Sequence, residues 1–192
     1  MRLQGMLVVL TASLVACGGG GGGGSDTGAG DSGAVPTPAD GDYCEPVESW
    51  TPAMTEFEED VIVLVNEARA AGATCGGTVY APTGPVSLNT ALRCSARVHS
   101  QDMAIQGFFD HVNLDGEDPF DRMSFAGYDY STAAENIAAG QLTPQAVMDG
   151  WMASPGHCVN VMNPAFAELG VGVYEGVASE FSIYWTQNFG SP

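Results

Sequence analysis

The feature that most constrains the fold is a change in hydrophobic spacing along the chain. From residue 55 to a turn after Pro155, apolar side chains recur at helical spacing. Leu169–Tyr174 and Phe181–Phe189 then read as strands, and the second of these alternates apolar with polar side chains. Helices first and strands last predict an α+β domain in which helices cover an antiparallel sheet.

Helix-end signals locate the predicted helices. Thr55 and Glu58 match a capping box for the first helix, which Gly72 ends. Asp118 is the predicted N-cap of a short helix that Gly127 closes. The predicted helices lie at 55–72, 89–107 and 118–127 and from 143 onward, with a short helical turn after 155.

The first seventeen residues read as an export signal. Arg2 precedes an apolar segment, Met6–Val15, that is too short to span a bilayer. Leu14-Val15-Ala16-Cys17 resembles a bacterial lipobox, in which the cysteine is diacylated and becomes the new N-terminus. The alternative is an ordinary secretory signal cleaved nearby, with Cys17 incidental. Either way we expect an extracytoplasmic protein, and lipidation would anchor it to a membrane, with a weak preference for the outer membrane.

Residues 18–43 begin with seven consecutive glycines and continue with small and polar residues. Such a segment cannot bury enough apolar surface to order itself, so we expect a flexible tether. We therefore divide the chain into a signal at 1–17, this tether, an N-terminal extension at 44–54 and one folded domain at 55–192.

The formal charge of −18, with no lysine and five arginines, excludes several partners. Nucleic acid and anionic lipid headgroups both require a basic surface. We therefore expect no nucleic-acid partner, and a monomer whose membrane contact is the lipid anchor.

Four cysteines remain once Cys17 is set aside, and an even number in an exported domain predicts two disulfides. Three pairings of Cys44, Cys75, Cys94 and Cys158 are possible. We favour Cys75–Cys94 with Cys44–Cys158, and a free thiol at Cys158 is the alternative. No C-x-x-C pair exists, which argues against zinc held by cysteines.

Four segments carry most of the residues suited to chemistry. Together they hold all three histidines, a glutamate among small apolar residues and two of the three tryptophans. They are Ala96–Met103 running on to His111, Ala134–Ala138, Trp151–His157 and Tyr184–Gly190. In this order they resemble the CAP superfamily (cysteine-rich secretory proteins, antigen 5, pathogenesis-related class 1) in its bacterial secreted branch. The resemblance covers roughly 55–190 and implies a three-layer α–β–α sandwich.

The resemblance also implies a central cavity with two histidines and two acidic residues that can bind a divalent metal. His111 and Glu135 fit two of these four positions. Ser154 stands where the family has the second acidic residue, and Tyr184 stands at the second histidine, in Tyr-Trp-Thr-Gln where the family has His-Tyr-Thr-Gln. Two of the four metal ligands are therefore missing.

His157 could restore part of the site. His111, Glu135 and His157 would form a partial Zn²⁺ site with an open position for water. The alternative, which we favour, is that these groups hydrogen-bond loop backbone and hold the cleft walls together. Ser154, Tyr184 and Gln187 are expected to line the same cleft.

Other pairings have simpler explanations. The spacing of Ser154 and His157 is typical of a helix cap at Ser154, and we prefer this interpretation to a catalytic pair of nucleophile and base. His99 and Asp102 are three residues apart and predict an intrahelical pair. The acidic residues 110–121 fail the EF-hand register, so we interpret Asp115-Gly116 as a turn. Trp151 and Trp185 are expected in the core.

Three functions remain open. The cleft could bind a small apolar ligand, a peptide or a protein partner. It could instead carry out metal-assisted hydrolysis of peptides or another envelope polymer, or the domain could be purely structural. The sequence does not decide whether the protein is an enzyme, although the missing ligand positions favour binding.

Overall fold

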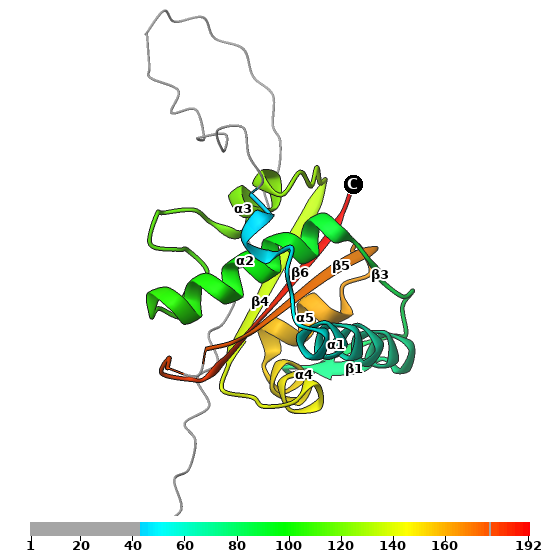
Figure 1. The fold of residues 1–192 in the computed structure, drawn as a ribbon. Coiled ribbons are helices and arrows are strands. Elements are labelled where there is room, and N and C mark those ends of the chain that lie inside the picture. Colours follow the sequence, from blue (N-terminus) through cyan, green and yellow to red (C-terminus); the bar gives the residue numbers. More distant parts are fainter. Residues whose placement is uncertain (1–42, 177) are drawn as a thin grey trace, which may run out of the picture.

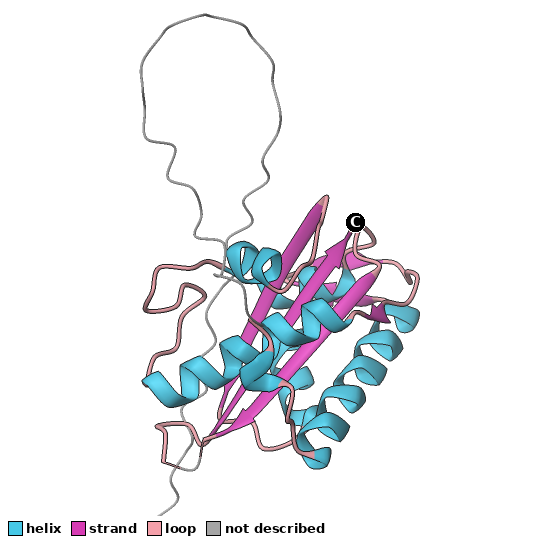
Figure 2. Cartoon of the chain, turned by 45° about the horizontal axis from the view of Figure 1, so that its top comes forward, coloured by secondary structure: helices cyan, strands magenta, loops and turns pink. Residues whose placement is uncertain are grey.

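A computed structural model describes residues 43–176 and 178–192 as a sheet with helices on both faces (Figure 1). The predicted signal, Cys17 and nearly all of the predicted tether lie outside the described residues. Turning the molecule shows the longest strands side by side, with α2 lying along them (Figure 2). The three-layer arrangement confirms the predicted fold class.

The main sheet has the strand order β3-β5-β6-β4. Strands β5 (Glu168–Glu175), β6 (Ile183–Ser191) and β4 (Thr132–Ala139) are antiparallel, and the short β3 (Ser87–Leu88) pairs parallel with β5. A separate hairpin joins β1 (Ala73–Cys75) to β2 (Thr78–Tyr80). Strands β5 and β6 were predicted from the sequence, whereas β4 and the shorter strands were not. The expected sheet was antiparallel, but β3 pairs parallel with β5.

The helices follow the predicted end signals closely. Asn89 Oδ1 accepts from the amides of Ala91 and Leu92, and Gly107 ends the same helix in a left-handed conformation. The helical elements are η1 (Glu45–Val47, 3₁₀), α1 (Pro52–Ala71), α2 (Thr90–Gln106), α3 (Pro119–Phe125), α4 (Pro144–Ala153) and α5 (Pro155–Met162).

Two predicted caps need correction. The first helix begins earlier than expected, because Thr51 accepts from the amide of Met54 and Pro52 occupies the first helical position. Ser154 precedes α5 as predicted, but its side chain makes no capping hydrogen bond.

The two faces of the sheet are covered by different helices. The larger apolar core lies between the sheet and α1, α4 and α5, and it contains Trp151 and Trp185, as predicted. On the other face, α2 packs directly onto β5 at Gly170 and Gly172. A Cβ atom at either glycine would overlap the α2 backbone, so the close approach of helix and strand depends on the two glycines.

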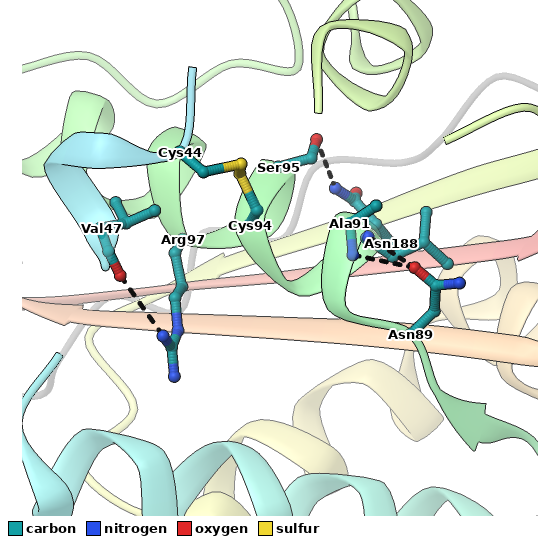
Figure 3. The surroundings of a disulfide bond; sticks show 9 residues. Cys44, Val47, Asn89, Ala91, Cys94, Ser95, Arg97 and Asn188 are labelled. Carbon is teal, nitrogen blue, oxygen red and sulfur yellow. Dashed lines mark hydrogen bonds between the residues drawn. A yellow bond between two sulfur atoms is a disulfide. The ribbon is translucent and has the colours of Figure 1, made fainter. Parts of the chain in front are cut away.

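The disulfides are Cys44–Cys94 and Cys75–Cys158, so all four cysteines are paired but not in the favoured pairing. The reason is the layer to which each cysteine belongs. Extension residue Cys44 lies against α2, where Val47 is buried and accepts from Arg97 (Figure 3). Strand β1 instead packs against α5, which brings Cys75 to Cys158. In the described part of the chain, no helix combines the length and apolar character needed to cross a membrane.

Candidate functional site

The centre of the candidate site is the carboxylate of Glu135 on β4. Side chains alternate along a strand, so Glu135 and Ile137 face α2 whereas Asn136 and Ala138 face the opposite layer. In the β4–β6 register Glu135 lies opposite Asn188. The sheet therefore holds a charged group beneath α2, with a side chain only 1% exposed.

Arg122 neutralises this buried charge. It lies on α3, whose start is fixed by a capping box between Asp118 and Asp121. Arg122 Nη2 donates to Glu135 Oε2 at 2.9 Å and to Oε1 at 3.1 Å, and Nη1 donates to the Glu117 carbonyl at 2.8 Å. The guanidinium is fully buried, so the pair joins α3 to the sheet inside the protein.

Two histidines approach the same carboxylate. His111 lies between α2 and α3, and its Nδ1 is 2.8 Å from Glu135 Oε1. Because an ionised carboxylate only accepts, His111 Nδ1 is the donor, and Nε2 carries the lone pair in the neutral ring. His99 on α2 is fully buried and donates from Nε2 to the Asp110 carbonyl at 3.0 Å; the same atom lies 3.8 Å from Glu135 Oε1.

Asn188 completes the surroundings of the carboxylate. With its amide nitrogen facing Glu135, Asn188 donates to Oε2 at 3.0 Å while its oxygen accepts from Ser95 Oγ at 3.1 Å. Both carboxylate oxygens therefore accept from at least two donors, supplied by α3, β6 and the segment after α2.

These contacts fix the charge states in the site. Burial alone, the largest influence, would raise the pKa of Glu135, but the Arg122 charge and the two neighbouring histidines outweigh it and lower the pKa to about 2. Burial lowers the pKa of His99 to about 3, against the opposing effect of Glu135. At neutral pH the site therefore contains a carboxylate, a guanidinium and a neutral His99.

The structure brings together only part of the predicted cleft. His111 and Glu135 are in contact, but His157 is buried on α5, which packs with α1 and α4 over the other face of the sheet. Gln187 faces that same layer and accepts from Asn136 at 3.0 Å.

The remaining predicted cleft residues also lie apart from Glu135. Tyr184 is on the α2 face but four positions along β6 from Asn188, in an apolar cluster with Met103 and Ile137. Ser154 lies at the junction of α4 and α5.

The proposed zinc set of His111, Glu135 and His157 is therefore not assembled. Among residues 43–176 and 178–192, no group of three or more histidine, cysteine, aspartate and glutamate side chains is placed to hold a metal ion. The physical reason is the strand alternation of β4. It turns Glu135 toward α2, away from the layer that contains α5.

Sequence reasoning missed three members of the site. The sequence-based prediction assigns Arg122 no role, includes Asn188 only as part of a segment and pairs His99 with Asp102. Asp102 instead accepts from Gln106, so the predicted intrahelical pair is wrong. One sequence signal could have identified Arg122. The chain has only five arginines and no lysine, so a buried glutamate has few possible positively charged partners. By contrast, Asp115-Gly116 forms the predicted turn, with Gly116 at φ +87°.

The α–β–α sandwich agrees with the family that the sequence resembles. The chain belongs to the cysteine-rich secretory protein (CAP) family, whose sequence model matches residues 63–189.

The most informative relatives are bacterial. The chain is 36% identical over 152 residues to YkwD, an uncharacterised protein of Bacillus subtilis, covering 79% of this chain and 54% of that protein. It is 30% identical over 142 residues to YlbC, an uncharacterised membrane protein of the same organism, covering 74% of this chain and 36% of that protein. This chain thus spans about half, or less, of the curated relatives it matches.

Solved structures show the same fold. An extracellular SCP-domain protein from Bacillus anthracis matches with a TM-score of 0.63 and 26% identity, covering 75% of this chain and 45% of that chain. An outer surface protein from Borrelia burgdorferi matches with a TM-score of 0.57, covering 69% of this chain and 92% of that chain; at 18% identity it supports the fold alone.

Proposed function

We propose that this protein is an exported, lipid-anchored CAP domain that binds a peptide or protein partner at His111. Export is supported by the two disulfides, which persist outside the reducing cytoplasm, and by the extracellular relative from Bacillus anthracis. The lipid anchor rests on the lipobox-like sequence that ends at Cys17.

The observation that carries the binding proposal is the state of the His111 ring. Glu135 holds Nδ1, whereas Nε2 has no hydrogen-bond partner among the described residues. The ring is 21% exposed, although Nε2 itself is covered. A ligand donor bound to Nε2 would supply the missing hydrogen bond, and because Nε2 is covered this binding would require a local shift of the segment between α2 and α3.

The surroundings of His111 favour a partner with apolar side chains. Val112 is 44% exposed and Leu114 is 65% exposed in the same segment between α2 and α3. We interpret these two exposed apolar side chains, which lie close to His111 in the sequence, as part of its binding surface. Metal-dependent hydrolysis has less support, because the donor set that it needs is divided between the two layers.

A peptide titration tests the proposed site. We expect trileucine with blocked ends to shift the ¹⁵N resonances of His111 together with the amides of Val112 and Leu114. His111→Gln should abolish the saturable shifts, whereas Asp115→Asn in the same segment should leave them unchanged. If trileucine and blocked trialanine shift none of these signals, or if His111→Gln binds like the wild type, the proposal fails.

The anchor is tested separately in cells. Cys17→Ser should move the protein from the membrane fraction to the soluble extracytoplasmic fraction, because the diacyl group has no attachment atom. Ser13→Ala, within the same signal, is the matched control and should leave the protein on the membrane. Unchanged membrane association of Cys17→Ser would exclude lipidation at this cysteine.

A further inference from the structure

A second candidate site is a groove between η1, the first turns of α2 and the end of α3. Its volume is about 430 Å³, within the range of roughly 300–1,000 Å³ that is typical of small-molecule sites. Val47, Ala91, Ala126 and the Cys44–Cys94 disulfide contribute apolar walls. Arg93 and Arg97, one helical turn apart on α2, line the same groove.

The arginines of this chain are few, and most are held by hydrogen bonds within the fold. Among the four that the structure describes, Arg69 donates four hydrogen bonds to backbone carbonyls and Arg122 binds Glu135. Arg97 forms a two-pronged pair with the buried Glu58. These three guanidinium groups are therefore part of the folded framework.

Arg93 is the one of these four whose side chain makes no hydrogen bond within the described residues, whereas in Arg122 only Nε lacks a partner. Arg93 Nε lies 3.5 Å from Glu58 Oε2, and its Nη2 lies 3.8 Å from Glu59 Oε1. Both nitrogens are covered and have no hydrogen-bond partner within the described chain, and the side chain is 13% exposed. Buried donors of a charged group are unfavourable when unpaired, so an acceptor that reached the Arg93 guanidinium from the groove would be bound favourably.

The charges around Arg93 define the ligand. Glu58 is shared between Arg93 and Arg97, which leaves one positive charge in excess among these three groups. The N-terminal end of α2 adds a favourable dipole for an anion. Glu48 lines the groove and Glu59 is 63% exposed beside Arg93, so a singly charged group suits the groove better than a doubly charged phosphate.

We propose that the groove binds a small organic anion with one carboxylate on a short apolar body. The carboxylate would accept from the Arg93 guanidinium, since a planar carboxylate matches the guanidinium fork. The apolar body would lie against Val47, Ala126 and the disulfide. This site is separate from His111, and Glu135 does not line it.

The test titrates the full exported protein, purified in a non-ionic detergent, with 4-phenylbutyrate. We expect saturable shifts of the Thr90, Ala91 and Ala126 amides. Arg93→Gln should weaken binding at least tenfold, and Glu59→Gln should tighten it severalfold because it removes a competing carboxylate. Ala126→Leu, which leaves Arg93 in place but fills the groove, should also abolish binding.

Three probes define the outcomes that overturn the proposal. Neutral 4-phenylbutanamide should not bind; equal binding of the amide would show that the carboxylate is not recognised. Inorganic phosphate binding in place of 4-phenylbutyrate would contradict the assigned ligand class, and acetate should bind weakly because it lacks the apolar body. Wild-type affinity in a folded Arg93→Gln or Ala126→Leu variant would also overturn the site, with folding checked by near-UV circular dichroism.

Discussion

At the scale of single residues, the decisive contact is the ion pair between Glu135 and Arg122. Both side chains are almost completely buried, and α3 is joined to the sheet through them. Glu135→Gln leaves the Arg122 charge without its counter-charge, so we expect the free energy of unfolding to fall by about 3 kcal/mol. Urea denaturation measures the loss. Glu67→Gln, at an exposed position on α1, is the matched control and should change stability by less than about 0.5 kcal/mol.

A second residue gives the molecule its expected sensitivity to mild acid. Burial lowers the pKa of His99 from 6.5 to about 3. The unfolded chain gains this proton below pH 6.5, whereas the folded chain gains it only near pH 3. The contribution of neutral His99 to the free energy of unfolding is therefore fully present above pH 6.5. It is lost as the pH falls from 6.5 toward 3, by up to about 1.4 kcal/mol per pH unit.

Replacement of His99 tests this assignment. We expect His99→Gln to be less stable than the wild type at pH 7.5, because it disturbs packing beside Phe108. Its stability should nevertheless fall less steeply between pH 6.5 and pH 4.5, since glutamine does not titrate. Urea midpoints at half-unit pH intervals give the two slopes. Identical slopes would assign the acid sensitivity to other groups.

At the scale of elements, the packing of α2 on β5 depends on the absence of side chains. Gly172→Ala places a Cβ atom inside the backbone of α2 at Ala96–Arg97, so the helix must move away from the sheet. We expect a loss of about 3 kcal/mol or more in the free energy of unfolding. Gly150→Ala in α4 meets no atom within 4 Å and should instead gain up to about 1 kcal/mol. Thermal unfolding of the two variants compares them, and equal effects would contradict this account.

Elements with local signals could be predicted from the sequence. Asn89 and Gly107 mark the ends of α2 through contacts within a few residues, and alternation identified β6. Strand β4 gave no such signal, because Ala133, Ala134, Ala138 and Ala139 leave no clear apolar–polar alternation around Glu135. The alanines become strand only through pairing with β6, about fifty residues later.

At the scale of the whole molecule, the site could be predicted only in part. The placement of His111 and Glu135 in one cavity followed from the family resemblance, whereas their direct hydrogen bond was not predicted. The roles of Arg122 and Asn188 required knowledge of which faces of β4 and β6 meet α2. The disulfide pairing failed for the same reason, since it depends on which layer each cysteine joins.

The two disulfides should contribute differently to the stability of the whole molecule. Each disulfide closes a long loop, with sequence separations of 50 and 83 residues. By restricting the unfolded chain, each is expected to add about 4 kcal/mol to the free energy of unfolding. Cys75 and Cys158 also lie in the main core, whereas Cys44 precedes a three-residue 3₁₀ helix. We expect Cys75→Ala with Cys158→Ala to be the more destabilising pair in urea.

Besides lowering global stability, the double variant Cys44→Ala with Cys94→Ala should loosen the N-terminal extension locally. Hydrogen exchange should accelerate chiefly in residues 45–50, because their covalent attachment to α2 is lost. Exchange measured by mass spectrometry across the whole chain checks this. Uniform acceleration in all layers would show that the Cys44–Cys94 bond supports the global fold instead.

The Cys44–Cys94 bond also decides how the domain responds to mechanical tension. The bond lies one position after Tyr43, the first described residue, and joins it to α2. A pull arriving from the N-terminal side therefore passes through sulfur into α2 and bypasses residues 45–93. While the bond is oxidised, α1, the β1–β2 hairpin and β3 cannot be stretched out by such a force. Only reduction would bring residues 45–93, about a third of the described residues, into the line of tension.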